Sequence, residues 1–206
     1  MFSDNLNKAI FIDKDGTLIN DVPYNVNPQL ITISNNVIEG LKLLKDQNFL
    51  FIVISNQSGV VRGFFKQKDL EKVNKKISEL LKAHNVFIDA FYYCPHHPEG
   101  KIKKYAVNCD CRKPAPGLIL KAANDFNINL TSSWMIGDIL NDIEAGNSAG
   151  CKTILINNGN ETEWLLNEKR KPFFISQHFK QAAEIIISEQ LNNKKNFVEN
   201  VRMEEL

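Results

Sequence analysis

The sequence has no long apolar run, no long basic run and few cysteines, and each absence excludes a class of protein. No stretch reaches the roughly 18 apolar residues that a membrane-spanning helix needs. The first residues, Met1-Phe2-Ser3-Asp4, lack the basic and apolar regions of a signal peptide, so we expect a cytoplasmic protein. A net charge of +1 without a basic run gives no sign of a nucleic-acid or anionic-membrane surface, which leaves a small diffusible molecule as the expected partner.

The composition of the chain is that of an ordinary globular protein. Its 206 residues, of which 43% are hydrophobic and 24% charged, are enough for one domain with a sizeable core. We expect this domain to cover residues 1–190 and to act as a monomer. Residues 191–206 are rich in Asn, Lys and Glu and are expected to form a C-terminal tail, to which the sequence assigns no role.

Three of the four cysteines lie close together in the chain, with two histidines among them. Cys94-x-His96 and Cys109-x-Cys111 are separated by twelve residues, and three thiolates with one imidazole make a four-ligand tetrahedral zinc set. Four protein ligands leave no position for water, so this zinc would fold the loop 94–111 and would not activate a nucleophile. His97 is expected to lie on the surface without a ligand role. The alternative is a set of unrelated buried cysteines.

An apolar run that reads as a buried strand, from Ala9 to Ile12, stops at Asp13-Lys14-Asp15-Gly16-Thr17. In open α/β sheets, ligands bind outside the carboxyl ends of the strands. Two carboxylates one residue apart at such an end can share a hard cation and a phosphate. A hairpin turn and a calcium loop are the alternatives, but a calcium loop that starts at Asp13 would need glycine and glutamate where the chain has Leu18 and Tyr24.

A second apolar run, residues 49–55, ends in Ser55-Asn56-Gln57-Ser58-Gly59. The hydroxyls and amides of this segment can donate hydrogen bonds to phosphate oxygens, although a polar turn without function has the same composition. Arg112 and Lys113 follow the cysteine-rich loop directly, and two fixed cations at that place suit a phosphorylated ligand.

A further strand is expected at residues 133–137, and it ends in Asp138, with Asp142 four residues later. Asp138 can complete a cation site with Asp13, while Asp142 orients a neighbour or caps the following helix. Helical spacing of apolar residues predicts helices at 37–45 and 67–84, and a further helix is expected from about Glu161. Strands are expected at 86–93, 152–156 and 172–175, and a long polar loop at 20–34 is expected over the carboxyl end of the sheet. This order is typical of an α/β fold with a mostly parallel sheet.

The order of these motifs resembles that of the haloacid dehalogenase superfamily of phosphohydrolases. The resemblance runs from about Ile10 to Ile156 and includes the acid pair, Ser-Asn-Gln, Lys and Gly-Asp-x-x-x-Asp. Cys94-Pro-His-His-Pro-Glu-Gly, the twelve-residue spacer and Cys-Asp-Cys-Arg-Lys-Pro closely resemble the D-glycero-D-manno-heptose 1,7-bisphosphate 7-phosphatase family, which removes the 7-phosphate in nucleotide-activated heptose biosynthesis. The resemblance implies a Rossmann-like three-layer sandwich, without a cap domain and with a zinc-bound loop.

The resemblance implies a role for each matching residue. Asp13 would be the nucleophile that takes the phosphoryl group as an aspartyl phosphate, and Asp15 would protonate the leaving sugar oxygen and then deprotonate water. Magnesium would bind Asp13, the backbone carbonyl of Asp15 and Asp138, where it offsets the repulsion between a carboxylate and a phosphate. Ser55 and Lys113 would hold the transferring phosphoryl oxygens.

The resemblance also implies a set of substrate-binding residues. Arg112 would recognise the substrate through its second phosphate, and the pocket would be lined by Asp21, Val22, Pro23, Tyr24, Asn56, Gln57 and Ser58. One position departs from the pattern, because this family usually has lysine directly after Gly-Asp and the chain has Ile139. The missing positive contact bears on substrate preference or rate and leaves every residue with a bond-making role in place.

Two other functions fit the same motifs. Histidinol-phosphate phosphatase has a related domain with a zinc loop, but its loop is typically shorter than the twelve-residue spacer, and Arg112 fits a doubly phosphorylated ligand. Arg-Lys-Pro occurs in both families and does not separate them. A zinc-stabilised sugar-phosphate binding module without catalysis is the alternative from another class, and it would have no need of the intact set Asp13, Asp15, Ser55, Lys113 and Asp138.

Overall fold

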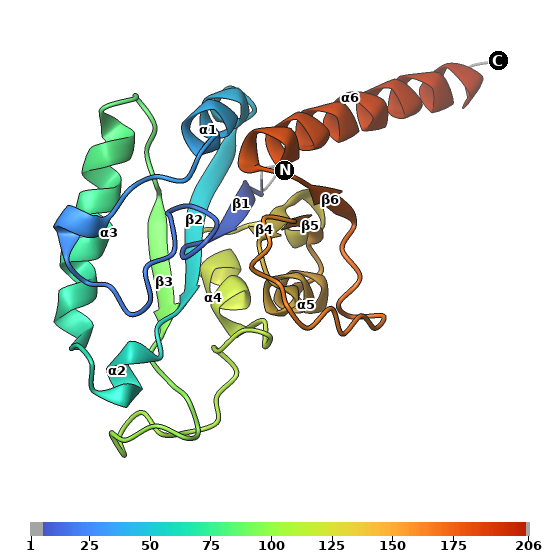
Figure 1. The fold of residues 1–206 in the computed structure, drawn as a ribbon. Helices are drawn as coiled ribbons and strands as arrows, with labels where there is room; N and C mark the ends of the chain where they lie inside the picture. The colour runs from blue at the N-terminus through green and yellow to red at the C-terminus, as the bar shows by residue number, and fades with distance from the viewer. Residues whose placement is uncertain (1–5, 205–206) are drawn as a thin grey trace.

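The computed structural model describes residues 6–204 and, in the last helix, side chains as far as residue 192. One six-stranded sheet, parallel throughout, runs through the molecule in the order β3-β2-β1-β4-β5-β6 (Figure 1). Its strands are β1 (Lys8–Asp13), β2 (Phe49–Asn56), β3 (Ala90–Cys94), β4 (Trp134–Gly137), β5 (Lys152–Ile156) and β6 (Phe174–Ser176). The predicted α/β fold with a parallel sheet is confirmed.

Helices cover both faces of the sheet, which is why its strands read as apolar runs. The helices are α1 (Val37–Lys45), α2 (Gly59–Arg62), α3 (Gln67–Lys82), α4 (Gly117–Asp125), α5 (Leu140–Ala149) and α6 (Phe179–Glu204), with short 3-10 helices at Pro28–Leu30 and Leu130–Ser132. Alternate residues of β1 enter different layers: Ile10 and Ile12 pack with α1, α3 and α6, whereas Ala9 and Phe11 pack with α4 and α5. The chain therefore forms the expected three-layer sandwich.

The strand order reverses between β1 and β4, which are hydrogen-bonded neighbours. In doubly wound folds, a crevice forms outside the carboxyl ends of the strands at this reversal, because the connections on its two sides leave in opposite directions. Asp13 is the last residue of β1, and Asp138 follows the last residue of β4. The topology thus brings together two acids that lie far apart in the sequence.

Two expected elements differ from the structure. The helix expected from about Glu161 is wrong: residues 157–173 form a loop in which Trp164 has a φ of 48° and Leu165 and Leu166 are exposed, so the apolar side chains have no core to face. The strand expected at 86–93 begins only at Ala90. Because α6 continues to Glu204, the boundary expected at residue 191 falls inside a helix, and the division into a domain and a tail stays a prediction.

Candidate active site

A cleft of about 280 Å³ lies at the reversal of the strand order. The side chains around it come from the ends of β1, β2 and β4, from the segment after the cysteine-rich loop and from the loop after β5. They are Asp13, Asp15, Asp21, Asn56, Lys113, Asp138, Ile139 and Asn160. The structure therefore places four of the five residues predicted for catalysis and magnesium binding, Asp13, Asp15, Lys113 and Asp138, around one cavity.

Lys113 is the centre of the charged cluster and is almost completely buried. Its ammonium donates to Asp13 Oδ1 and, over 2.9 Å, to the carbonyl oxygen of Ile54. It also forms an ion pair with Asp142 Oδ1 at 2.6 Å. The Asn56 amide holds the backbone of Lys113 by donating to its carbonyl over 2.9 Å and accepting from its N–H over 3.0 Å. The pKa of Lys113 is raised, since the two carboxylates outweigh the effect of burial, so the residue stays a cation.

Three acids crowd around this cation. Asp13, Asp138 and Asp142 each offer an oxygen within 4.8 Å of the others, and all three are buried. Burial, partly offset by Lys113, raises the pKa of Asp13 to about 7; burial together with the charge of Asp13 raises the pKa of Asp138 to about 6. Burial disfavours the ionised form of these carboxyl groups, and a bound divalent cation would favour the ionised form again.

The backbone at Gly16 supports the interpretation of a cation site. Gly16 has a φ of +85°, and a Cβ atom there would lie 2.2 Å from Asp138 Oδ2. The backbone of the loop after β1 therefore packs directly against the Asp138 carboxylate. Thr17 of the same loop donates to Asp138 Oδ1 over 3.0 Å. Clustered carboxylates supply the oxygen ligands that a hard cation such as Mg²⁺ prefers, so the residues present fit the group that the sequence implies.

Asp15 lies at the junction of two hollows. Its Oδ1 accepts from Lys14 Nζ at 2.5 Å and its Oδ2 accepts from Gln57 Nε2 at 2.9 Å. Beyond it is a second hollow of about 280 Å³, which shares Asp15, Asp21 and Asn56 with the first. Its wall also includes the sequence-predicted residues Pro23, Tyr24, Gln57 and Ser58. A phosphate monoester with a sugar-sized second part would have room on either side of Asp15.

Three of the predicted contacts are not seen in either hollow. Ser55 Oγ accepts from Gln57 Nε2 over 2.8 Å, and Arg112 Nη1 donates to the carbonyl of His96 over 3.3 Å. Neither residue lines the two hollows, and Val22 does not line them either. Ser55 points away because Ile54 is in register with Asp13, so the pleat sends Ser55 to the opposite face. The roles assigned to these three residues stay predictions.

The predicted cysteine cluster is assembled at the end of β3. One atom from each of Cys94, His96, Cys109 and Cys111 lies within 4.8 Å of the others, and all four cysteines of the chain are free thiols. The Sγ–Sγ and Sγ–Nδ1 separations range from 3.0 Å to 3.7 Å, near the edge of about 3.8 Å that a tetrahedron with zinc–sulfur bonds of about 2.3 Å has. This cluster could hold a metal, and its last residue, Cys111, lies two residues before Lys113 in the chain.

The sequence reasoning assigned no function to three residues of the site: Lys14, Thr17 and Asn160. Lys14 pairs with Asp15, and Asn160 Nδ2 donates to Asp138 Oδ2 over 2.6 Å. The segment Asn157-Asn158-Gly159-Asn160 directly follows β5. The rule that ligands bind at the carboxyl ends of parallel strands could have identified it, just as it identified Asp13 and Asp138.

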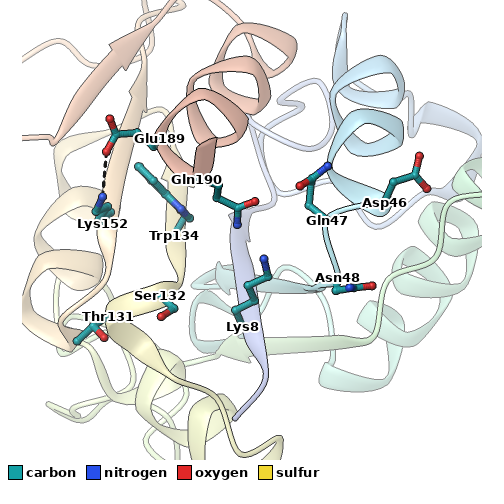
Figure 2. A pocket seen from close by; sticks show the side chains of 10 residues that line it. All are labelled: Lys8, Asp46, Gln47, Asn48, Thr131, Ser132, Trp134, Lys152, Glu189 and Gln190. Atoms are coloured by element: carbon teal, nitrogen blue, oxygen red, sulfur yellow. Dashed lines mark hydrogen bonds and ion pairs between the residues drawn. The ribbon is translucent and has the colours of Figure 1, made fainter. Parts of the chain in front are cut away.

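A larger hollow, of about 380 Å³, lies at the opposite end of the strands, where their amino ends are (Figure 2). It is bordered by Lys8, Trp134 and Lys152, near the amino ends of β1, β4 and β5. Lys152 is paired with Glu189 at 3.0 Å, and Lys8 lies over the ring of Phe49. Size alone does not make it the active site, because the clustered acids, the buried lysine and the strand reversal are all at the carboxyl edge.

Comparison with known proteins identifies the family. A HAD-hydrolase-like family model matches residues 110–182. The D-glycero-beta-D-manno-heptose-1,7-bisphosphate 7-phosphatase of Escherichia coli (strain K12) is 36% identical over 168 residues, covering 77% of this chain and 88% of that protein. The protein of the same name from Pasteurella multocida (strain Pm70) is 39% identical over 155 residues, covering 75% and 84% of the two chains.

A solved structure agrees with these relatives. The D,D-heptose 1,7-bisphosphate phosphatase from B. bronchiseptica, complexed with magnesium and phosphate, superposes with a TM-score of 0.73 and 26% sequence identity. The match covers 88% of this chain and 99% of that one. The chain therefore belongs to the D-glycero-beta-D-manno-heptose-1,7-bisphosphate 7-phosphatase family, within the HAD-like hydrolases.

Proposed function

We propose that this protein removes the 7-phosphate of D-glycero-D-manno-heptose 1,7-bisphosphate in nucleotide-activated heptose biosynthesis. The observation that carries the proposal is the contact of Asp13 with the buried cation of Lys113, beside Asp138, in a cleft that adjoins a second hollow. The first hollow would hold the reacting phosphate. The second would hold the sugar and the 1-phosphate, and the names of the relatives supply the substrate.

Two carboxylates would divide the chemistry. A carboxylate oxygen of Asp13 attacks phosphorus, the bond between phosphorus and the sugar oxygen breaks, and Asp15 gives that oxygen a proton. Asp15 then takes a proton from water as the water attacks phosphorus, which releases phosphate and regenerates Asp13. Lys113 stays protonated throughout and offsets the negative charge that gathers beside Asp13.

Both metal groups have residues that fit them. Mg²⁺ would be held by Asp13, Asp138 and the backbone carbonyl of Asp15, and when bound it would neutralise phosphate charge. Asp142 pairs with Lys113 through Oδ1, and its Oδ2 accepts hydrogen bonds from the N–H groups of residues 138 and 139 over 3.2 Å and 3.3 Å. Its carboxylate is therefore already paired, and it would orient the site without binding the metal. Zn²⁺ would be held by the cysteine cluster and would stiffen the loop 94–111, which leads directly into Arg112 and Lys113.

The stability gained from Mg²⁺ should increase with pH. Asp13 and Asp138 have pKa values of about 7 and about 6 in the fold, above the values near 4 of an unfolded chain. Without metal, the stability that these groups contribute is fully present below about pH 4 and is lost as the pH rises through about 6 to 7. Mg²⁺ binds the ionised forms, so we expect it to raise Tm clearly at about pH 8 and little at about pH 5. Thermal melts with Mg²⁺ or EDTA measure this, and equal gains at both pH values would contradict it.

Loss of one ligand should release zinc. We expect Cys109→Ser to reduce bound zinc from about one equivalent to a small fraction and to increase amide exchange over the loop 94–111, because a three-ligand site is far weaker than a closed one. Metal analysis by mass spectrometry checks the first result. Cys151→Ala is the matched control, since Cys151 is the one cysteine outside the cluster and should keep the metal. A full equivalent of zinc in Cys109→Ser would refute the ligand assignment.

Phosphate release from two kinds of substrate tests the proposed function. Purified protein with Mg²⁺ is given each anomer of the heptose 1,7-bisphosphate and, separately, histidinol phosphate. We expect kcat/KM to be higher for a heptose bisphosphate, with the 7-phosphate released. Faster release from histidinol phosphate would assign the rival function, and no release from either substrate would favour a binding module.

A further inference from the structure

The loop that replaces the expected helix after β5 is attached to the active site at several points. Asn158 Nδ2 donates to the carbonyl of Gly16 over 2.9 Å, and Asn158 Oδ1 accepts from the N–H of Asn160 over 3.1 Å. Glu161 Oε2 accepts from the N–H of Leu140, at the start of α5, over 2.6 Å. Residues 158–161 are therefore fixed to the loop after β1 and to the helix that carries Asp142.

These attachments place the Asn160 amide against the Asp138 carboxylate. Asn160 Nδ2 donates to Oδ2 over 2.6 Å, while Thr17 donates to Oδ1 over 3.0 Å. A Cβ atom at Gly16 would lie 2.5 Å from Asn160 Nδ2 as well as 2.2 Å from Asp138 Oδ2, so only glycine permits this arrangement. With one donor on each oxygen, the carboxylate has a single orientation.

The group that donates to Asp138 Oδ2 is the uncharged amide of Asn160, and its lack of charge matters for a cation bound to Asp138. Ile139, beside Asp138 in the chain, also lines the cleft and has no donor in its side chain. An amide fixes the carboxylate without cancelling its charge, so the charge of Asp138 stays available to a bound metal ion. Side chains that orient a metal ligand in this way typically change metal affinity by about 10–100-fold when they are removed.

We propose that Asn160 is a positioning residue that holds the Asp138 carboxylate in the orientation that binds Mg²⁺ and thereby sets the affinity for this ion. The inference rests on the proposed function for the identity of the metal, and it concerns the metal-binding step alone. Asn160 is exposed at the rim of the cleft, so its replacement leaves the core packing unchanged.

The test is Mg²⁺ binding by Asn160→Ala, with Mg²⁺ alone as the probe and no substrate present. Isothermal titration and the Mg²⁺ dependence of Tm should show a Kd raised by about tenfold or more, with Tm in EDTA unchanged. In turnover assays, the Mg²⁺ concentration for half-maximal rate should rise by the same factor, while kcat at saturating Mg²⁺ stays within about threefold. Asn157→Ala is the matched control, since Asn157 is an exposed residue of the same segment that does not line the cleft.

An unchanged Kd in Asn160→Ala would overturn the proposal, as would an equal rise in Asn157→Ala or a wild-type chain that does not bind Mg²⁺. A lower Tm in EDTA with unchanged affinity would show a purely structural role and would also overturn it. The binding measurement is independent of the proposed function, because a raised Kd supports the role of Asn160 even if the heptose bisphosphate is not hydrolysed.

Discussion

Asp13→Asn is expected to reduce turnover by at least about 10⁴-fold, because the amide cannot form the aspartyl phosphate. Burial raises the pKa of this carboxyl to about 7, so the loss of its pairing with Lys113 is offset at neutral pH by removal of a costly buried charge. Lys113 keeps its ion pair with Asp142 at 2.6 Å. We therefore expect a folded protein with a Tm equal to or above that of the wild type, as is common when a strained active-site group is replaced. Steady-state phosphate release and thermal melts measure the two quantities.

Asp46→Asn is the matched control for this variant. Asp46 is an exposed aspartate at the end of α1, beside the hollow at the opposite end of the strands. It should keep the wild-type rate. Activity of Asp13→Asn near that of the wild type would refute the covalent scheme, whereas an unfolded variant would contradict the energetic description of the cluster.

Lys113→Met is expected to damage both activity and stability. Methionine fills a similar volume but leaves Asp13 and Asp142 buried without their cation. Removing one partner of a buried ion pair typically costs about 3–5 kcal/mol, and loss of one charged donor at a reacting oxygen typically lowers kcat by about 10²–10³-fold. Without Lys113 the pKa values of both acids rise further, so the stability deficit should grow as the pH rises from about 5 to about 8.

Urea unfolding at the two pH values measures this effect. Lys121→Met on α4 is the control, because Lys121 is an exposed lysine that pairs with Asp125 four residues later, and such pairs are worth well under about 1 kcal/mol. The double variant Lys113→Met/Asp142→Asn should recover part of the lost stability, since it removes one of the two unpaired charges. A Lys113→Met protein as stable as the wild type would show that the cation does not hold the cluster together.

Much of the site was predictable because its signals are local in the sequence. The strands β1, β2, β4 and β5 are apolar runs that each end at polar residues, and parallel strands place those ends at one edge. This is why Asp13 and Asp138 were expected together and why the structure shows them in one cleft. The cysteine cluster was predictable for a similar reason, because its spacing alone matches a four-ligand set.

The features of the site that could not be predicted depend on tertiary contacts between segments that are far apart in the sequence. The contact of Asn56 with the backbone of Lys113 joins segments that are 57 residues apart. The helix expected between β5 and β6 is absent because Leu165 and Leu166 have no core to face, and the contact of Asn160 with Asp138 depends on the same tertiary path, so neither could be read from local propensity. The orientation of Ser55 depends on the register of β2 against β1, which only the structure supplies: Asn56, not Ser55, shares the face of Asp13.

Trapping the phosphorylated enzyme tests the central claim most directly. The protein is mixed with the heptose 1,7-bisphosphate and Mg²⁺, quenched within one turnover and treated with borohydride, which reduces an aspartyl phosphate to homoserine. Peptide mass spectrometry should then find homoserine at position 13, only when substrate was present and not in Asp13→Asn. Turnover without any modification at position 13, or modification at another carboxylate, would contradict the assignment of Asp13 as the nucleophile.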